Sequence, residues 1–203
     1  ADGLADEPKV LSLGAYGDID FFGLKGVVEA LLHSIRVGGV SYQACRDNAS
    51  YHPGRCATVC VGGEQIGVLG QIHPTVCANY GVDTALYCAE LSFEALMRFQ
   101  GPEREYVPLP KFPSVARDIA VVCDASIPVA TLENCISRGA RGLLKEVELF
   151  DIYTGAPIPA GKKSVAFNLT LRSDERSLTA AEADEDVKSV LELLQKELGA
   201  VLR

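Results

Sequence analysis

The residues best suited to contact another molecule lie in the second half of the chain. Asp151 and Tyr153 fall in one strand-like segment, and Ser164 begins the next. An aromatic ring with hydrogen-bonding neighbours suits an unstacked RNA base. Basic side chains of the type that holds phosphates occur in the same half, at Lys111, Arg117, Lys163 and Arg172. The alternative is a merely solvated sheet face, which periodicity alone favours.

A second candidate is the run from Tyr51 to Arg55, in which His52 and Arg55 have the types of a catalytic pair. No Ser, Cys or carboxylate is arranged around this run as a triad. His-Pro-Gly is more typical of a turn, so we interpret these residues as turn chemistry, with Arg55 in a structural ion pair. His73 before Pro74 is interpreted as the start of a helix. The histidines show no ligand spacing and no C-x-x-C pair is present, so the sequence predicts no catalytic residue and no metal site.

The composition limits the class of protein. The 203 residues carry a formal net charge of −8, which excludes a protein that coats nucleic acid through bulk charge but allows a local basic patch. No apolar run approaches the roughly 18 residues of a membrane span, and the acidic N-terminus lacks the regions of a signal peptide. The seven cysteines are interpreted as reduced residues of a cytoplasmic protein. Because the chain has no initiator Met, we expect it to be part of a longer protein.

The chain is expected to form two domains. Residues 100–113 hold four of the ten prolines, and proline interrupts regular structure. The sequence therefore predicts a domain over 1–101, a Pro-rich linker over 102–109 and a second domain over 110–203.

The second domain is predicted to have the order β-α-β-β-α-β. Its expected strands and helices span 115–123, 129–138, 144–153, 164–172, 180–198 and 200–202. The third strand alternates cleanly between apolar and small polar residues, which indicates a sheet covered on one face. Thr179 and Glu182 have the spacing of a capping box. This order is typical of the ferredoxin-like split βαβ fold.

The first domain is predicted to be α+β as well. Its expected elements are a strand at 10–13, a helix at 22–35, strands at 41–46, 56–61, 65–71 and 86–93, and a short helix from Pro74. Gly62 and Gly63 indicate a hairpin turn. The GxxG run from Gly67 to Gly70 lies within an apolar strand, so we interpret it as close strand packing and not as a nucleotide loop.

Four groups of motifs together resemble a known family. They lie at 20–26, at 51–55 with 66–74, at 110–120, and at 149–155 with 161–164 and 176–179. In this order and spacing the chain resembles the C-terminal region of the bacterial phenylalanyl-tRNA synthetase beta subunit. The resemblance implies that 1–101 is the end of a class II synthetase-like antiparallel module that has lost the catalytic motifs. It implies that 110–203 is a ferredoxin-fold anticodon-binding domain.

The resemblance also implies a function. The chain would bind the anticodon region of phenylalanine tRNA and scaffold an (αβ)2 synthetase, without binding DNA or a membrane. Phenylalanine activation with ATP and magnesium would occur on the alpha subunit, so this part of the ligase would need no cofactor and perform no chemistry itself. Asp151, Tyr153 and Ser164 would read the first anticodon base: Tyr153 by stacking, Asp151 by accepting hydrogen bonds from a guanine, and Ser164 by donating or accepting one. Two alternatives from other classes are a ferredoxin-like regulatory module that binds a small ligand between subunits and a purely structural interaction domain.

Overall fold

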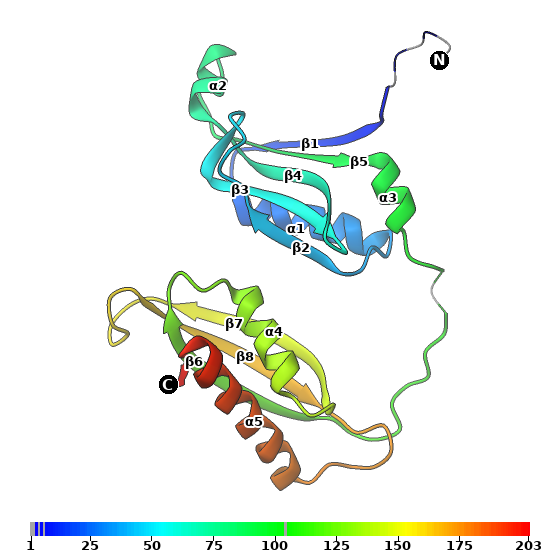
Figure 1. Ribbon diagram of the computed structural model, residues 1–203, viewed down its shortest axis with the longest axis vertical. Coiled ribbons are helices and arrows are strands. Elements are labelled where there is room, and N and C mark those ends of the chain that lie inside the picture. Colours follow the sequence, from blue (N-terminus) through cyan, green and yellow to red (C-terminus); the bar gives the residue numbers. More distant parts are fainter. Residues whose placement is uncertain (1–2, 4, 6, 104) are drawn as a thin grey trace. The chain divides into compact units, whose positions relative to one another are not determined.

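The computed structural model describes residues 3, 5, 7–103 and 105–203. The chain divides into two compact units, residues 1–105 and 106–203 (Figure 1). Residues 101–103 and 105–114 belong to no helix or strand. Each unit is α+β with one antiparallel sheet, which confirms the expected fold class.

The N-terminal unit has a five-stranded sheet in the order β1-β5-β4-β3-β2. Its elements are β1 (Val10–Tyr16), α1 (Phe21–Ser34), β2 (Val40–Ala44), β3 (Tyr51–Val61), β4 (Glu64–Ile72), α2 (Pro74–Asn79), β5 (Leu86–Ser92) and α3 (Phe93–Phe99). Helix α1 begins where the Asp20 side chain accepts a hydrogen bond from the Gly23 N–H at 2.8 Å. Its apolar stripe, Leu24, Val28 and Leu32, is buried in the core of this unit, and the helix packs on β4 and β5.

The prediction of a turn at His52–Arg55 was wrong about the element, because β3 begins at Tyr51. Tyr51 pairs with Ile72 and Cys56 pairs with Gly70, so the residues between them form an irregularity in the register. The local geometry is still turn-like, since His52 Nδ1 accepts the Gly54 N–H at 3.0 Å. A Cβ on Gly70 would lie 2.8 Å from Cys56 Cα, which confirms the close strand packing expected there.

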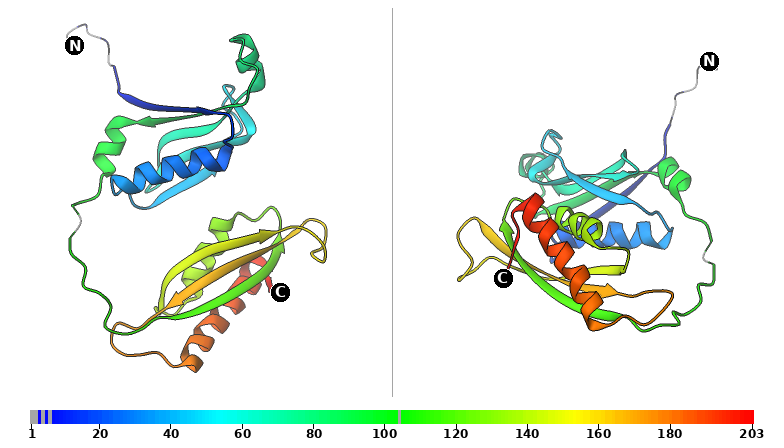
Figure 2. Two further views of the ribbon diagram at one scale, coloured as in Figure 1. Left: turned by 180° about the vertical axis from the view of Figure 1, so that it is seen from behind. Right: turned by 60° about the horizontal axis from the view of Figure 1, so that its bottom comes forward.

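The C-terminal unit has a four-stranded antiparallel sheet in the order β7-β8-β6-β9. Its elements are β6 (Val115–Asp124), α4 (Val129–Gly139), β7 (Leu144–Tyr153), β8 (Lys162–Leu171), α5 (Ala180–Leu198) and β9 (Val201–Leu202). Both helices cover one face of the sheet, and Figure 2 (left) shows the other face in front of them. The predicted β-α-β-β-α-β order is therefore confirmed.

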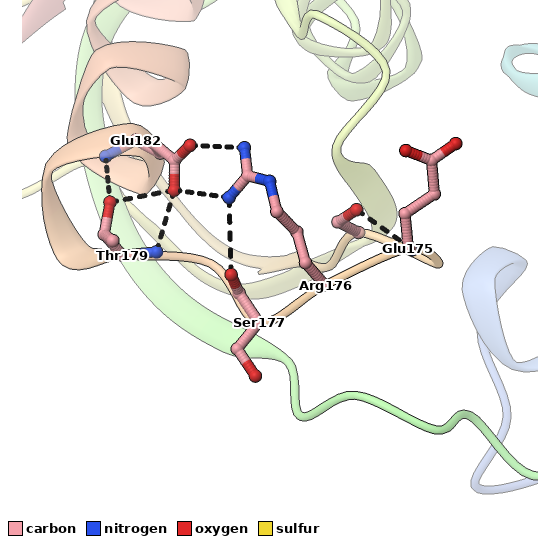
Figure 3. A network of polar contacts seen from close by, with 6 residues as sticks. Glu175, Arg176, Ser177, Thr179 and Glu182 are labelled. Carbon is pink, nitrogen blue, oxygen red and sulfur yellow. Dashed lines mark hydrogen bonds and ion pairs between the residues drawn. The ribbon is translucent and has the colours of Figure 1, made fainter.

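The inward residues of β8 form the centre of this unit. Val165, Phe167 and Leu169 are fully buried against residues of α4 and α5. Helix α5 begins at the expected capping box (Figure 3): Glu182 N–H donates to Thr179 Oγ1 at 3.3 Å, and Thr179 N–H donates to Glu182 Oε2 at 2.9 Å. These contacts place both helices on one side and leave the other side of the sheet without a helix.

Candidate nucleic-acid interface

We call the sheet face opposite α4 and α5 the open face. Residues directly opposite one another on antiparallel strands share a face, so the register defines its rows. One row runs across the sheet through Tyr153, Ser164, Val122 and Val201. The next row runs through Asp151, Ala166 and Ala120. The Arg203 N–H donates to the Ala120 carbonyl at 2.9 Å, which extends this second row to Arg203.

An irregularity in β7 turns Asp151 and Tyr153 onto the open face. Leu149 pairs with Phe167 on the helix-covered face, whereas Asp151 pairs with Ala166 on the open face. A regular strand would place residues two apart on the same face. The register shift at Phe150 therefore reverses the alternation, and bulges of this kind are common where a side chain must be re-aimed.

The side chain of Tyr153 is held in one orientation. Its hydroxyl donates to the Ala156 carbonyl at 2.8 Å. A Cβ on Gly155 would lie 2.7 Å from Tyr153 Cζ, so the ring packs closely on the glycine backbone. Tyr153 as a residue remains 40% exposed, so an aromatic side chain in a fixed position is presented on the open face.

Ser164 lies on the open face but is only 3% exposed, and its neighbour Ala166 is 7% exposed. No helix covers this side, so the cover comes from larger side chains of the face itself. The Arg203 guanidinium carbon lies 5.9 Å from the centroid of the Tyr153 ring, and these side chains start from opposite edges of the sheet. The expected base-contacting hydroxyl of Ser164 thus lies beneath its neighbours.

The structure does not gather the four basic residues expected to contact phosphate. Arg117 lies on the helix-covered face, where its Nε donates to Asp184 at 2.8 Å. Lys163 also lies on that face and donates to the Ile127 carbonyl at 2.5 Å. Arg172 contacts Asp174 at 3.4 Å, while Lys111 is exposed in the segment before β6. Their locations do not support a single phosphate-binding surface.

Two other cations flank the Tyr153 end of the open face. The Arg203 guanidinium lies over the Tyr153 ring. Lys162 pairs with Asp124 across the sheet, and their side chains form an ion pair at 3.0 Å. Of these two residues, sequence reasoning missed Arg203. For Arg203 a signal was present, because alternation from Val201 places it on the same face as Tyr153.

The other end of the open face is acidic. Asn168 Nδ2 donates to Asp118 Oδ1 at 2.7 Å, and Glu148 lies opposite Asn168 on the adjacent strand. Glu146 lies in the next row. Carboxylates repel phosphate, so this end of the open face is poorly suited to a nucleic-acid backbone.

In the N-terminal unit, the histidines and Arg55 have structural partners. The rings of His52 and His73 stack with centroids 6.5 Å apart, and His73 Nδ1 accepts the Thr75 N–H at 3.2 Å where α2 begins. Arg55 Nη1 donates to Gln71 Oε1 at 2.6 Å, so the expected ion pair was wrong and an amide is the partner. These contacts hold turns and strands together.

Four of the seven cysteines are poorly suited to nucleophilic chemistry. Burial raises the pKa of the Cys56 thiol to about 12 and also raises the pKa of Cys88, Cys123 and Cys135. Across residues 3, 5, 7–103 and 105–203, no group of His, Cys, Asp or Glu is placed to hold a metal ion. Within the same residues, no helix is long and apolar enough to span a membrane.

Comparisons with known families match both units. Residues 110–203 match the ferredoxin-fold anticodon binding domain, and residues 1–93 match the phenylalanyl tRNA synthetase beta chain CLM domain. The phenylalanine–tRNA ligase beta subunit of Clostridium acetobutylicum is 40% identical over 197 residues, which cover 97% of this chain and 25% of that protein. The corresponding subunit of Clostridium tetani is 39% identical over 200 residues, covering 98% and 25%. That of Symbiobacterium thermophilum is 39% identical over 212 residues, covering 98% and 24%. The chain thus spans about a quarter of the length of these relatives.

Proposed function

Because this chain belongs to the phenylalanyl-tRNA synthetase beta subunit family, we propose that the Tyr153 end of its open face binds the anticodon of phenylalanine tRNA. The observation that carries the proposal is the exposed Tyr153 ring, held by Ala156 and accompanied by Asp151 on the same strand. A base that is unstacked from its neighbours gains a new stacking partner on such a ring.

Each of the three residues has a separate role in reading the first anticodon base. Tyr153 stacks on the base whatever its identity. Asp151 accepts hydrogen bonds from the ring and exocyclic N–H groups of a guanine, which gives the site its preference. Ser164 donates or accepts a further hydrogen bond once the side chains above it have moved.

The proposal assigns no chemical step to this chain. Phenylalanine activation with ATP and magnesium belongs to an alpha subunit, and the beta chain acts with it in an (αβ)2 assembly. Within the assembly, the N-terminal unit serves as scaffold and the C-terminal unit contacts the tRNA.

The test is a binding titration over a series of salt concentrations. One arm uses a phenylalanine tRNA transcript, and the other uses the same transcript changed only at the first anticodon base. Tighter binding of the unchanged transcript supports base reading on the open face. Equal binding of both transcripts, or no binding at low salt, overturns the proposal. In the second case, thermal stabilisation by an amino acid or nucleotide would indicate the small-ligand module instead.

A further inference from the structure

Arg203 differs from most basic side chains of its unit in having no carboxylate partner. Arg117, Arg138 and Arg141 each form an ion pair with a residue of α5, and Lys145, Arg172 and Arg176 also pair with carboxylates. Among the described residues, Arg203 forms no such pair, and its side-chain contact is with the Tyr153 ring. The N–H groups of its guanidinium are therefore available to an anion.

The contact between Arg203 and Tyr153 joins the two edge strands of the sheet. Asp151 and Arg203 occupy the two ends of one row, separated by Ala166 and Ala120. Adjacent strands lie about 4.8 Å apart, so the row is about 14 Å long. Small side chains occupy the middle of this row, and Arg203 reaches from one edge of the sheet to the Tyr153 ring at the other edge. The Tyr153 ring and the Arg203 guanidinium thus meet at this end of the open face.

We propose that Arg203 is an RNA-binding residue that covers the Tyr153 ring in the free protein and moves to a backbone phosphate when a base takes its place. This inference rests on the proposed function and extends it. Stacking of a base on an aromatic ring is typically stronger than an exposed cation–π contact, so the exchange is favourable. Moving the guanidinium also exposes Ser164 to the base.

The assignment explains how an acidic chain binds RNA locally. The open face carries carboxylates at its other end, at Asp118, Glu146 and Glu148. A phosphate placed beside Arg203 lies at the opposite end of the face and gains a bidentate partner. Arg203 positions the strand in this arrangement, whereas Asp151 selects the base.

The main test measures tRNA binding by the Arg203→Ala chain over a series of salt concentrations. We expect affinity to fall by roughly 5-fold and the negative slope of log K against log salt to become shallower by about 1. The loss should be the same for both first-base transcripts, because a phosphate contact carries no base preference. Arg138→Ala removes the same charge from α4 on the covered side, and it should change neither quantity.

The possible results separate the inference from the proposed function. Unchanged affinity and slope for Arg203→Ala, while Tyr153→Ala weakens binding, overturns the phosphate contact and keeps the base-reading site. Tighter binding by Arg203→Ala also overturns the phosphate contact, because Arg203 would then only block access to the Tyr153 ring. If the unsubstituted chain binds neither transcript, the proposed function fails and the inference fails with it.

A second measurement tests the contact without relying on affinity. The chain contains no Trp, so Tyr153→Trp provides a single tryptophan at the site, whose emission can be excited apart from that of the tyrosines. Adding Arg203→Ala should change its emission in the free protein, and saturating tRNA should remove the difference. No difference in the free protein would overturn the contact, and a difference that persists with bound tRNA would overturn the exchange.

Discussion

The two faces of the C-terminal sheet use charged side chains differently. On the helix-covered face, Arg117 is bound to Asp184 and Lys163 to a backbone carbonyl. Asp186 is fully buried and accepts the Arg141 N–H at 2.8 Å. On the open face, Tyr153 and Asp151 are exposed. Charged groups on the helix-covered face are thus bound within the fold, whereas side chains on the open face remain accessible to another molecule.

This difference shows that the partner of a cation indicates its role better than its charge does. Arg117 and Arg203 have the same side chain and lie on adjacent strands, β6 and the extension of β9. If the Arg117 side chain left Asp184 to bind a phosphate, it would only exchange one anionic partner for another. Arg203 would gain an anion without losing one, so only the second contact adds binding free energy.

The largest effect that separates the two faces is expected from Tyr153→Ala. Loss of base stacking should weaken tRNA binding by about 1–3 kcal/mol, or roughly 5- to 150-fold, with little change in the free energy of unfolding. Titration with the tRNA transcript and urea denaturation measure the two quantities. Tyr80→Ala, at an exposed tyrosine of the other unit, is the control. A large loss of stability with unchanged binding would assign Tyr153 to the core instead.

Asp151→Asn sharpens the comparison within the open face. The neutral amide accepts hydrogen bonds from guanine less strongly than the carboxylate does, so discrimination at the first anticodon base should fall by about 1 kcal/mol, or roughly 5-fold. The measurement is the ratio of affinities for the two transcripts. Fold stability should stay nearly unchanged because Asp151 is exposed. Equal weakening for both transcripts would contradict a base-reading role.

Arg117→Ala tests the helix-covered face. The Arg117–Asp184 ion pair is partly exposed, so its loss should lower the free energy of unfolding by no more than about 1 kcal/mol. Because Arg117 is on the covered face, tRNA affinity and salt slope should match those of the unsubstituted chain. If the negative slope of log K against log salt became shallower by about 1, Arg117 would be a phosphate contact after all.

The smallest effect is expected from the capping box of α5. The Arg176 guanidinium, with hydrogen bonds from Thr179, lowers the pKa of Glu182 from 4.5 to about 2. A carboxyl whose pKa is lowered on folding stabilises the protein above its unfolded pKa, and this stabilisation is lost as the pH falls.

The melting temperature of Glu182→Gln should therefore be lower than that of the unsubstituted chain at neutral pH. The gap should close as the pH falls from 4.5 to about 2. Glu175→Gln removes a nearby carboxylate outside the capping box and is the control. A gap that stays constant over this range would contradict the assigned contact.

Much of the fold was predictable because its determinants are local. The spacing of Leu24, Val28 and Leu32 is enough to indicate α1, and the alternation of Val165, Phe167 and Leu169 is enough to indicate the covered face of β8. The capping box of Thr179 and Glu182 depends on residues three apart. The irregular start of β3 was missed because it depends on pairing with β4 and not on its own residues.

The sequence by itself determined the order of helices and strands in the C-terminal unit, together with the aromatic and the carboxylate of the proposed site. Only the tertiary structure decided which face Asp151 and Tyr153 occupy, because the register shift in β7 is defined against β8. It also decided that Arg117 and Lys163 are held by the fold and that Arg203 reaches Tyr153. Alternation and capping act over a few neighbouring residues, whereas register and the partners of a charge depend on segments far apart in the chain.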